Sequence, residues 1–209
     1  ELFNNNFSNS IIKQKKDVIA NLKPLATRKS SEAVLNSLFK LKNNLIGGSA
    51  DLAGSNNTKS KFNKVINAKN FDGDYIHYGV REHAMCGIMN GLALHSNLIP
   101  YGGTFLIFSD YCKPSIRLSA LMKQRVIYVM THDSIGLGED GPTHQPIEQL
   151  SGLRSIPNLN ILRPADQTET IECWDLALKN SKTPSILALT RQNFCLLYTS
   201  PSPRDNPAS

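Results

Sequence analysis

Apolar residues recur at helical spacing in four parts of the chain. The first helix is predicted from Ser30 or the serine after it, either of which can serve as the N-cap. A second begins at Glu82, and a third is expected to open at Pro114, a residue that fits the first helical turn. The fourth starts at Asp166, where Glu169 three residues later gives a capping-box-like pattern. The predicted buried positions are Val34, Leu35, Leu38 and Leu41; Met85, Ile88, Met89 and Leu92; Leu118, Leu121 and Met122; and Ile171, Trp174 and Leu178.

Short apolar runs between these helices are typical of strands. The run VIYVM, residues 126–130, is continuously apolar, which indicates a strand covered on both faces of a parallel sheet. Further strands are predicted at YIHYGV, at the start of LIPYGGTF, at LNILRP and at PSILALT, whereas LIGGSADLAGSN opens with only a very short apolar entry. Strands that alternate with helices predict an α/β fold, with an open, mostly parallel sheet and helices on both faces.

Ligands of such sheets bind beyond the carboxyl ends of the strands, and several polar residues are predicted to lie there. They are Arg81, Glu82, His132, Glu139, Asp140 and His144. Taken singly, Glu82 could merely complement a helix dipole, and each histidine could be structural. The loop GEDGPTHQP, however, holds its side chains between rigid proline and glycine residues, which indicates a polar small-molecule site.

Three aromatic residues, Phe105, Phe108 and Tyr111, follow one another at intervals of three. This spacing is ordinarily that of a core stripe. Because the segment follows YGGT, which has the composition of a loop, the rings could instead wall a flat ligand ring. The residues alone leave both interpretations open.

The two ends of the chain differ in composition from its centre. Residues 1–27 are rich in Asn and Lys, with one short amphipathic stretch, and are expected to be a linker or arm from a preceding domain. Residues 28–193 are expected to form one domain, and residues 194–209 a disordered or artefactual tail. With neither an initiator Met nor a signal sequence at its start, the chain reads as part of a longer protein.

Composition argues against several functional classes. The chain has 209 residues and a formal charge of +6, but its lysines are scattered and lack interleaved aromatic residues, so we expect no nucleic-acid partner. No apolar run approaches the roughly 20 residues of a membrane helix, so we expect no membrane partner. Four cysteines, far apart and without a CxxC motif, argue against a metal cluster or a disulfide framework and favour a reducing, cytoplasmic location.

Six motifs together resemble one family. GGSADLAGSN, YGVREHAMCGIMNG, PYGGTFLIFSDY, THDSIGLGEDGPTHQP, LRPAD and TRQN occur in the order found in the middle, pyrimidine-binding domain of transketolase. The resemblance runs from about residue 26 to Asn193, and GEDGPTHQP after THDSIG is its most specific part. It implies a thiamine diphosphate enzyme that transfers a two-carbon ketol unit between ketose and aldose phosphates, as in the pentose phosphate pathway.

The resemblance also implies roles for individual residues. Glu82 matches the glutamate that hydrogen-bonds the pyrimidine ring of the cofactor and controls its protonation, and is thus expected to be catalytic. Phe105, Phe108 and Tyr111 match the aromatic pocket around that ring, and Asp51 matches an aspartate close to it.

Sugar phosphates are the substrates that the resemblance implies. The positions that match the substrate channel are Arg28, Ser55, His132, Asp140, His144 and Arg191. Guanidinium groups suit phosphate oxygens, and His132 is expected nearest the reacting centre, where it would also be catalytic.

Much of a transketolase is not represented in this chain. The diphosphate and its divalent cation, Mg²⁺ or Ca²⁺, are expected to be held by a preceding domain, so no metal ligand is assigned here. In the family the site lies between two subunits of a homodimer, and we therefore expect the isolated chain to be inactive. Two alternatives are a related ketol transferase such as dihydroxyacetone synthase, and a non-catalytic module that pairs with another chain.

Overall fold

The computed structural model describes residues 5–21, 23–41 and 44–193. The tail predicted for residues 194–209 lies outside these ranges. Six parallel strands form one open sheet in the order β2-β1-β3-β4-β6-β5, which confirms the predicted fold class. The strands are β1 (Leu45–Ser49), β2 (Tyr75–His77), β3 (Ile99–Phe105), β4 (Ile127–Thr131), β5 (Asn160–Leu162) and β6 (Ser185–Leu189).

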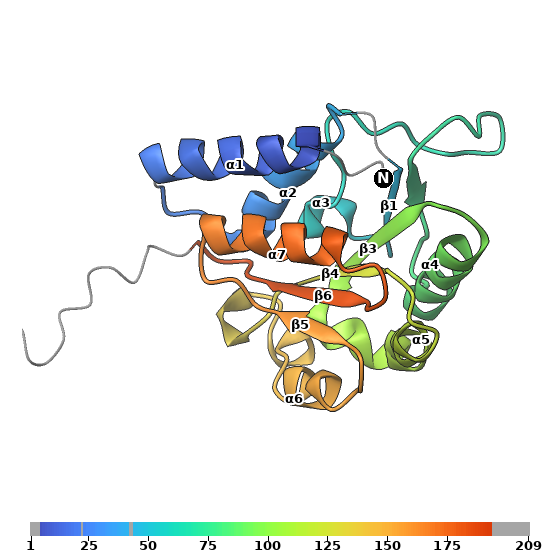
Figure 1. Cartoon of the computed structure of the whole chain (residues 1–209). Helices are drawn as coiled ribbons and strands as arrows, with labels where there is room; N and C mark the ends of the chain where they lie inside the picture. The colour runs from blue at the N-terminus through green and yellow to red at the C-terminus, as the bar shows by residue number, and fades with distance from the viewer. Residues whose placement is uncertain (1–4, 22, 42–43, 194–209) are drawn as a thin grey trace, which may run out of the picture.

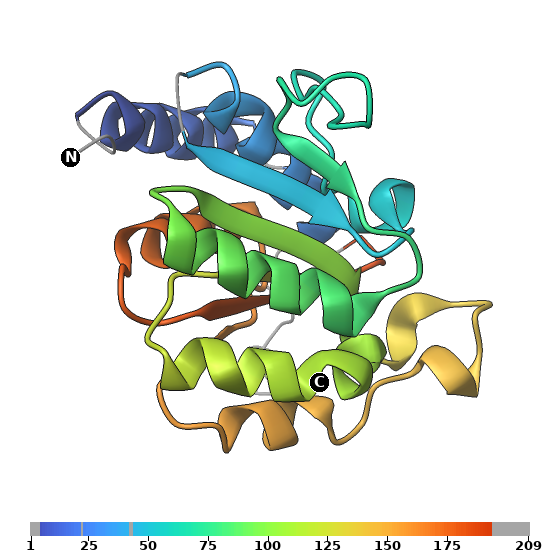
Figure 2. The same ribbon diagram turned by 90° about the vertical axis from the view of Figure 1, so that its right-hand side faces the viewer.

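Helices cover both faces of this sheet (Figures 1 and 2). One face packs against α1 (Asn5–Ala20), α2 (Thr27–Leu38) and α7 (Gln167–Lys179), and the other against α4 (Glu82–His95), α5 (Ser109–Leu121) and α6 (Gln149–Arg154). A further short helix, α3 (Ala53–Asn56), follows β1. The apolar layer on the first face includes Trp174 and the layer on the second face includes Tyr128, and both side chains are fully buried.

The prediction for α5 was wrong in two respects. The helix begins at Ser109, so Pro114 lies inside it, and Leu118 and Leu121 are 46% and 66% exposed rather than buried. Apart from Ile116, its buried side carries small residues: Ser109, Cys112, Ser115, Ser119 and Ala120. Small side chains let α4 and α5 pack closely, which is why a pattern based on large apolar residues pointed to the opposite side.

The segment YGGT is strand and not loop. Gly102 and Gly103 lie in the middle of the fully buried β3. A Cβ atom on Gly102 would come within 2.4 Å of the Met89 sulfur in α4, and one on Gly103 within 2.5 Å of Thr58. The glycines therefore allow α4 and the segment after α3 to contact a central strand directly.

Two further helical predictions need correction, and a third agrees with the structure. Helix α2 starts at Thr27, so Ser30 lies inside it rather than at the N-cap, and Ile88 of α4 is 48% exposed. At α7, by contrast, the Asp166 carboxylate accepts from the Glu169 backbone N–H at 2.8 Å, as the capping pattern predicted.

Residues 1–27, expected to be an arm, contain helix α1. Ile11 is 2% exposed and packs in the core, and Lys15 pairs with Glu172 of α7. The division into arm, domain and tail remains a prediction. Within the described ranges, no helix has the length and apolar character to cross a membrane.

Candidate functional site

The candidate site lies at the edge of the sheet formed by the carboxyl ends of the strands. There, successive strands of the chain are added first on one side of β1 and then on the other. From β1 the sheet extends one way to β2 and the other way to β3, β4 and β6. Open parallel sheets place ligands at such a switch point. Most of the predicted site residues lie in the segments that follow β1, β3, β4 and β6.

Two phenylalanines form a flat apolar wall after β3. The rings of Phe105 and Phe108 are stacked, with centroids 5.6 Å apart and planes inclined by 15°. Tyr111 extends the wall at 5.8 Å from Phe108, although its side chain is 65% exposed. Phe105 is buried because it ends a central strand, whereas Phe108 is only half-buried. The residues thus belong partly to the core and partly to a surface that a planar ring could stack on.

Both loop imidazoles contact this wall. The ring of His132 lies over Phe105 with centroids 3.8 Å apart, and His144 packs edge-on against Phe105 and Phe108 at 5.9 and 5.3 Å. His132 directly follows β4 and adopts a left-handed backbone with φ 60°. Such a conformation costs a non-glycine residue about 1 to 2 kcal/mol, so the surrounding contacts must hold it in place.

Charged groups surround His132. Burial lowers its pKa to about 4, and the positive charges of Arg28 and Arg191 act in the same direction, while Asp140 opposes them. His144 adds a smaller lowering of this pKa. The imidazole of His132 is therefore neutral at physiological pH, and the residue is only 3% exposed.

Two arginines from opposite ends of the domain meet here. Arg28 at the start of α2 donates from Nη1 to the Ser55 backbone oxygen at 2.7 Å, which ties α2 to α3. Burial lowers the pKa of Arg28, and the neighbouring charge of Arg191 lowers it further. Arg191, which follows β6, forms an ion pair with the exposed Glu139 at 3.6 Å. The charge of Asp140 opposes this lowering of the Arg28 pKa, so the two guanidinium groups are only partly compensated and form a site suited to an anionic ligand.

Glu82 is the first residue of α4 and is 9% exposed. Among the described residues, none forms a hydrogen bond with its carboxylate. One turn further along α4 lies Cys86, whose thiol contacts that of Cys112 in α5. Cys112 in turn donates to the Phe108 backbone oxygen at 3.7 Å, so α4 is linked to the aromatic wall through two buried thiols.

Other predicted residues are less closely tied to this cluster. Asp51 has a left-handed φ of 60° and an exposed side chain, and no contact within the described ranges joins it to the aromatic wall. Ser55 contributes its backbone oxygen to Arg28. No group of three or more His, Cys, Asp or Glu side chains in the described residues is arranged to hold a metal ion.

Sequence reasoning missed the polar residues behind the site. Asp133 is buried and receives the Arg163 Nε–H at 2.7 Å, while its Oδ1 has no partner. Asn56, also buried, donates to the Thr104 backbone oxygen and to Thr131. Asp133 lies two residues after the end of β4 and Asn56 is the last residue of α3, and neither residue type pointed to a distinctive chemistry.

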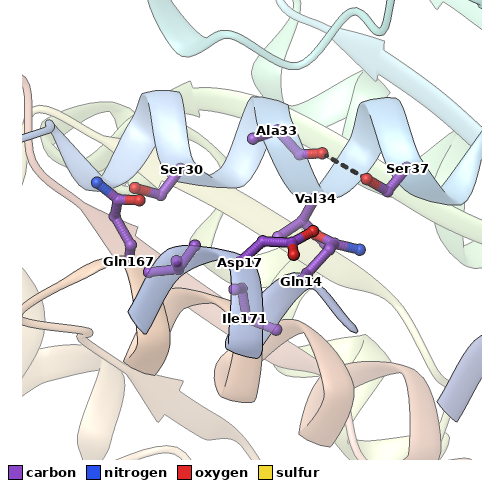
Figure 3. A pocket seen from close by; sticks show the side chains of 9 residues that line it. Gln14, Asp17, Ser30, Ala33, Val34, Ser37, Gln167 and Ile171 are labelled. Atoms are coloured by element: carbon purple, nitrogen blue, oxygen red, sulfur yellow. Dashed lines mark hydrogen bonds between the residues drawn. The ribbon is translucent and has the colours of Figure 1, made fainter. Parts of the chain in front are cut away.

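A separate pocket of about 150 Å³ lies among α1, α2 and α7 (Figure 3). It shares no lining residue with the predicted site. The lining residues are Gln14, Asp17, Val18, Ser30, Ala33, Val34, Ser37, Gln167 and Ile171.

Comparison with known proteins places this geometry in a family. The family model for "Transketolase, pyrimidine binding domain" matches residues 23–195. A transketolase of Cereibacter sphaeroides is 58% identical over 175 residues, which cover 84% of this chain and 27% of the relative. The chain thus spans about a quarter of the length of such curated relatives.

Solved structures agree with this result. The structure of Pichia stipitis transketolase in complex with sedoheptulose-7-phosphate superposes with a TM-score of 0.81 at 50% identity, covering 83% of this chain and 27% of that one. A split-gene transketolase, described as an inactive β4 tetramer, superposes with a TM-score of 0.66 at 27% identity, covering 84% of this chain and 54% of that one.

Proposed function

The chain belongs to the transketolase family, and we propose that it contributes the pyrimidine-binding half of a thiamine diphosphate site that transfers ketol units between sugar phosphates. The observation that carries this proposal is the position of Glu82, a residue only 9% exposed, at the first turn of α4, the helix linked to the aromatic wall through Cys86 and Cys112. None of the described residues forms a hydrogen bond with this carboxylate, so it is free to share a proton with a nitrogen of a ligand ring.

The residues of this chain fit the pyrimidine ring of the cofactor. Phe105 and Phe108 offer a stacked apolar wall, and Glu82 begins the helix that is linked to that wall through buried thiols. When bound, thiamine diphosphate supplies a thiazolium carbon that can act as a nucleophile toward the ketose carbonyl. Glu82 holds or shares the proton at the pyrimidine ring, and Phe108 orients that ring by stacking.

The polar half of the site fits a sugar phosphate. Arg28 and Arg191 lie close enough to influence the same imidazole, and each can form paired hydrogen bonds with phosphate oxygens. Asp140 and His144 have hydrogen-bonding groups suited to sugar hydroxyls, and Ser55 lies beside Arg28. His132, neutral and buried on the aromatic wall, is placed to hydrogen-bond an oxygen of the reacting sugar.

This chain supplies one side of the site, and the second side comes from another domain in a homodimer. Exposed apolar side chains lie close in sequence to the site residues: Val80, Ile135 and Ile147 are each 70% exposed or more. Apolar residues grouped around a polar site are typical of a surface that a partner covers. The diphosphate and its divalent cation, Mg²⁺ or Ca²⁺, are held by that other domain, and the location is cytoplasmic.

Because it has half a site, the isolated chain should not catalyse ketol transfer. The split-gene transketolase, of which this chain covers about half, is an inactive tetramer, and its inactivity supports this expectation. Measurable transfer by the purified chain without a partner would contradict the half-site proposal.

A chimera tests the function directly. Residues 23–195 replace the matching segment of the Cereibacter sphaeroides transketolase, and ketol transfer from a ketose phosphate to an aldose phosphate is measured with and without added thiamine diphosphate. We expect activity that requires the cofactor, with the same relative lacking this segment as the inactive control. A folded chimera that stays inactive at saturating cofactor would contradict the proposal.

The phosphate role has its own variant. Arg191→Ala in the chimera should raise the KM for phosphorylated donors by about 30-fold, which corresponds to about 2 kcal/mol of lost contact. Unphosphorylated donors serve as the matched control. An equal loss with both kinds of donor would count against a phosphate contact at Arg191.

A further inference from the structure

A buried chain of hydrogen bonds leads from α3 to the imidazole of His132. Asn56 Nδ2 lies 2.7 Å from the Thr104 backbone oxygen and 2.8 Å from Thr131 Oγ1. Thr131 Oγ1 lies 2.9 Å from His132 Nδ1. Asn56, Thr104 and Thr131 are fully inaccessible to solvent, so water cannot replace any of these bonds.

The chemistry of the Thr104 carbonyl fixes the direction of this chain. A carbonyl oxygen can only accept, so the amide nitrogen of Asn56 must face it, and the second amide hydrogen then points to Thr131 Oγ1. Thr131 accepts that hydrogen and keeps its own hydroxyl proton. Within the described residues, the ring nitrogen of His132 is the acceptor recorded for this proton.

We propose that Asn56 and Thr131 are positioning residues that hold the neutral imidazole of His132 in one tautomer, with Nδ1 as acceptor and the proton on Nε2. The reverse arrangement, with Nδ1 donating to Thr131, would leave the buried hydroxyl proton of Thr131 without an acceptor. That loss should favour the Nε2–H form by about tenfold or more.

The consequence is that His132 presents a hydrogen-bond donor to the site. None of the described residues bonds to its Nε2, and the ring plane is fixed by its contact with Phe105. The matching ligand atom is an oxygen, either a carbonyl or a hydroxyl oxygen of a sugar. This last step depends on the proposed function, whereas the tautomer depends only on the contacts within this chain.

A second histidine in the same loop system provides an internal comparison. Thr143 Oγ1 lies 2.8 Å from His144 Nδ1, so the pair has the same Thr–His contact, but it is exposed. Among the described residues, no side-chain amide donates a hydrogen bond to the Thr143 hydroxyl. Its proton can therefore turn to solvent, and His144 should be less strongly biased toward one tautomer than His132.

The test is long-range ¹H–¹⁵N correlation NMR of the chain labelled at its histidines, above about pH 7 so that the ring of His132 is neutral. His132→Asn identifies the signals of this residue. For His132 we expect the Nε2–H tautomer to exceed the Nδ1–H tautomer by about tenfold or more. For His144 we expect a smaller ratio of the two tautomers. A proton on Nδ1 of His132, or equal ratios at the two histidines, would overturn the proposal.

Two variants separate positioning from general stability. Thr131→Val, which keeps the shape of the side chain, should reduce the ratio at His132 by about tenfold, whereas Thr131→Ser should retain it. Thr143→Val serves as the control and should leave His132 unchanged. An unaltered tautomer ratio in folded Thr131→Val would contradict the proposed chain of hydrogen bonds. If that variant does not fold, the tautomer ratio of His132 in the wild type tests the proposal. Because no turnover is measured, failure here is distinct from failure of the chimera.

Discussion

Acidification should destabilise the fold through the protonation of His132. Burial lowers the pKa of this imidazole from 6.5 to about 4; Arg28, Arg191 and His144 contribute to the lowering, and Asp140 opposes it. The unfolded chain therefore takes up this proton near pH 6.5, well before the folded chain does. Stability from this group is complete above pH 6.5 and is lost as the pH falls toward 4.

The magnitude follows from the difference between the two pKa values. It corresponds to about 3 kcal/mol for the complete titration, of which about 2 kcal/mol should appear within the pH range of the assay. The assay is urea unfolding followed by circular dichroism between about pH 7.5 and about pH 4.5, for the wild type and His132→Asn. Asparagine tolerates the left-handed backbone at this position, so the variant removes the titrating ring with little added strain.

The comparison between the two proteins cancels the titration of every other group. We expect the stability advantage of the wild type over His132→Asn to shrink by about 2 kcal/mol across this pH range. Parallel curves for the two proteins would refute the reasoning, because they would show that His132 titrates alike in the folded and unfolded chains.

Two further predictions concern the framework of the domain. Asp166→Ala should lower the free energy of unfolding by about 1 kcal/mol, because it removes the cap on the Glu169 backbone N–H, whereas Asp166→Asn should keep most of it; equal losses in urea unfolding would exclude a capping role. Arg163→Met should lower the free energy of unfolding by about 2 kcal/mol, because the buried Asp133 loses its only cation among the described residues. The loss is limited because the Arg163 side chain is half-exposed. Adding Asp133→Asn should recover part of that loss, and no recovery would show that the ion pair is not the cause.

The sequence predicted the fold class well because its strongest signals were local. The capping pattern at Asp166 and the stripe with Trp174 identified α7, and the continuous apolar run of β4 indicated a sheet buried on both faces. The errors arose where tertiary packing decides. In β3, the glycines adapt the strand to Met89, and in α5 small residues form the buried side.

The candidate site was predictable to the extent that its residues belong to distinctive motifs. The loop with Asp140 and His144 drew attention by its composition, and the structure places His144 against the aromatic wall. Asn56 and Thr131 lie at the edges of the motifs GGSADLAGSN and THDSIGLGEDGPTHQP, but their residue types did not indicate a role. Their contribution depends on hydrogen bonds between segments that are far apart in the sequence, and the sequence does not indicate that these segments are in contact.

Turnover of the chimera with Glu82→Gln tests the central claim most directly. Glutamine keeps the size of the side chain but cannot share a proton with the pyrimidine ring. We expect kcat to fall by about 100-fold or more, with the KM for the sugar phosphate changed by less than about threefold. Unchanged turnover, or a loss confined to KM, would show that Glu82 does not control the cofactor's proton and would contradict the assignment of this domain as the pyrimidine half of the site.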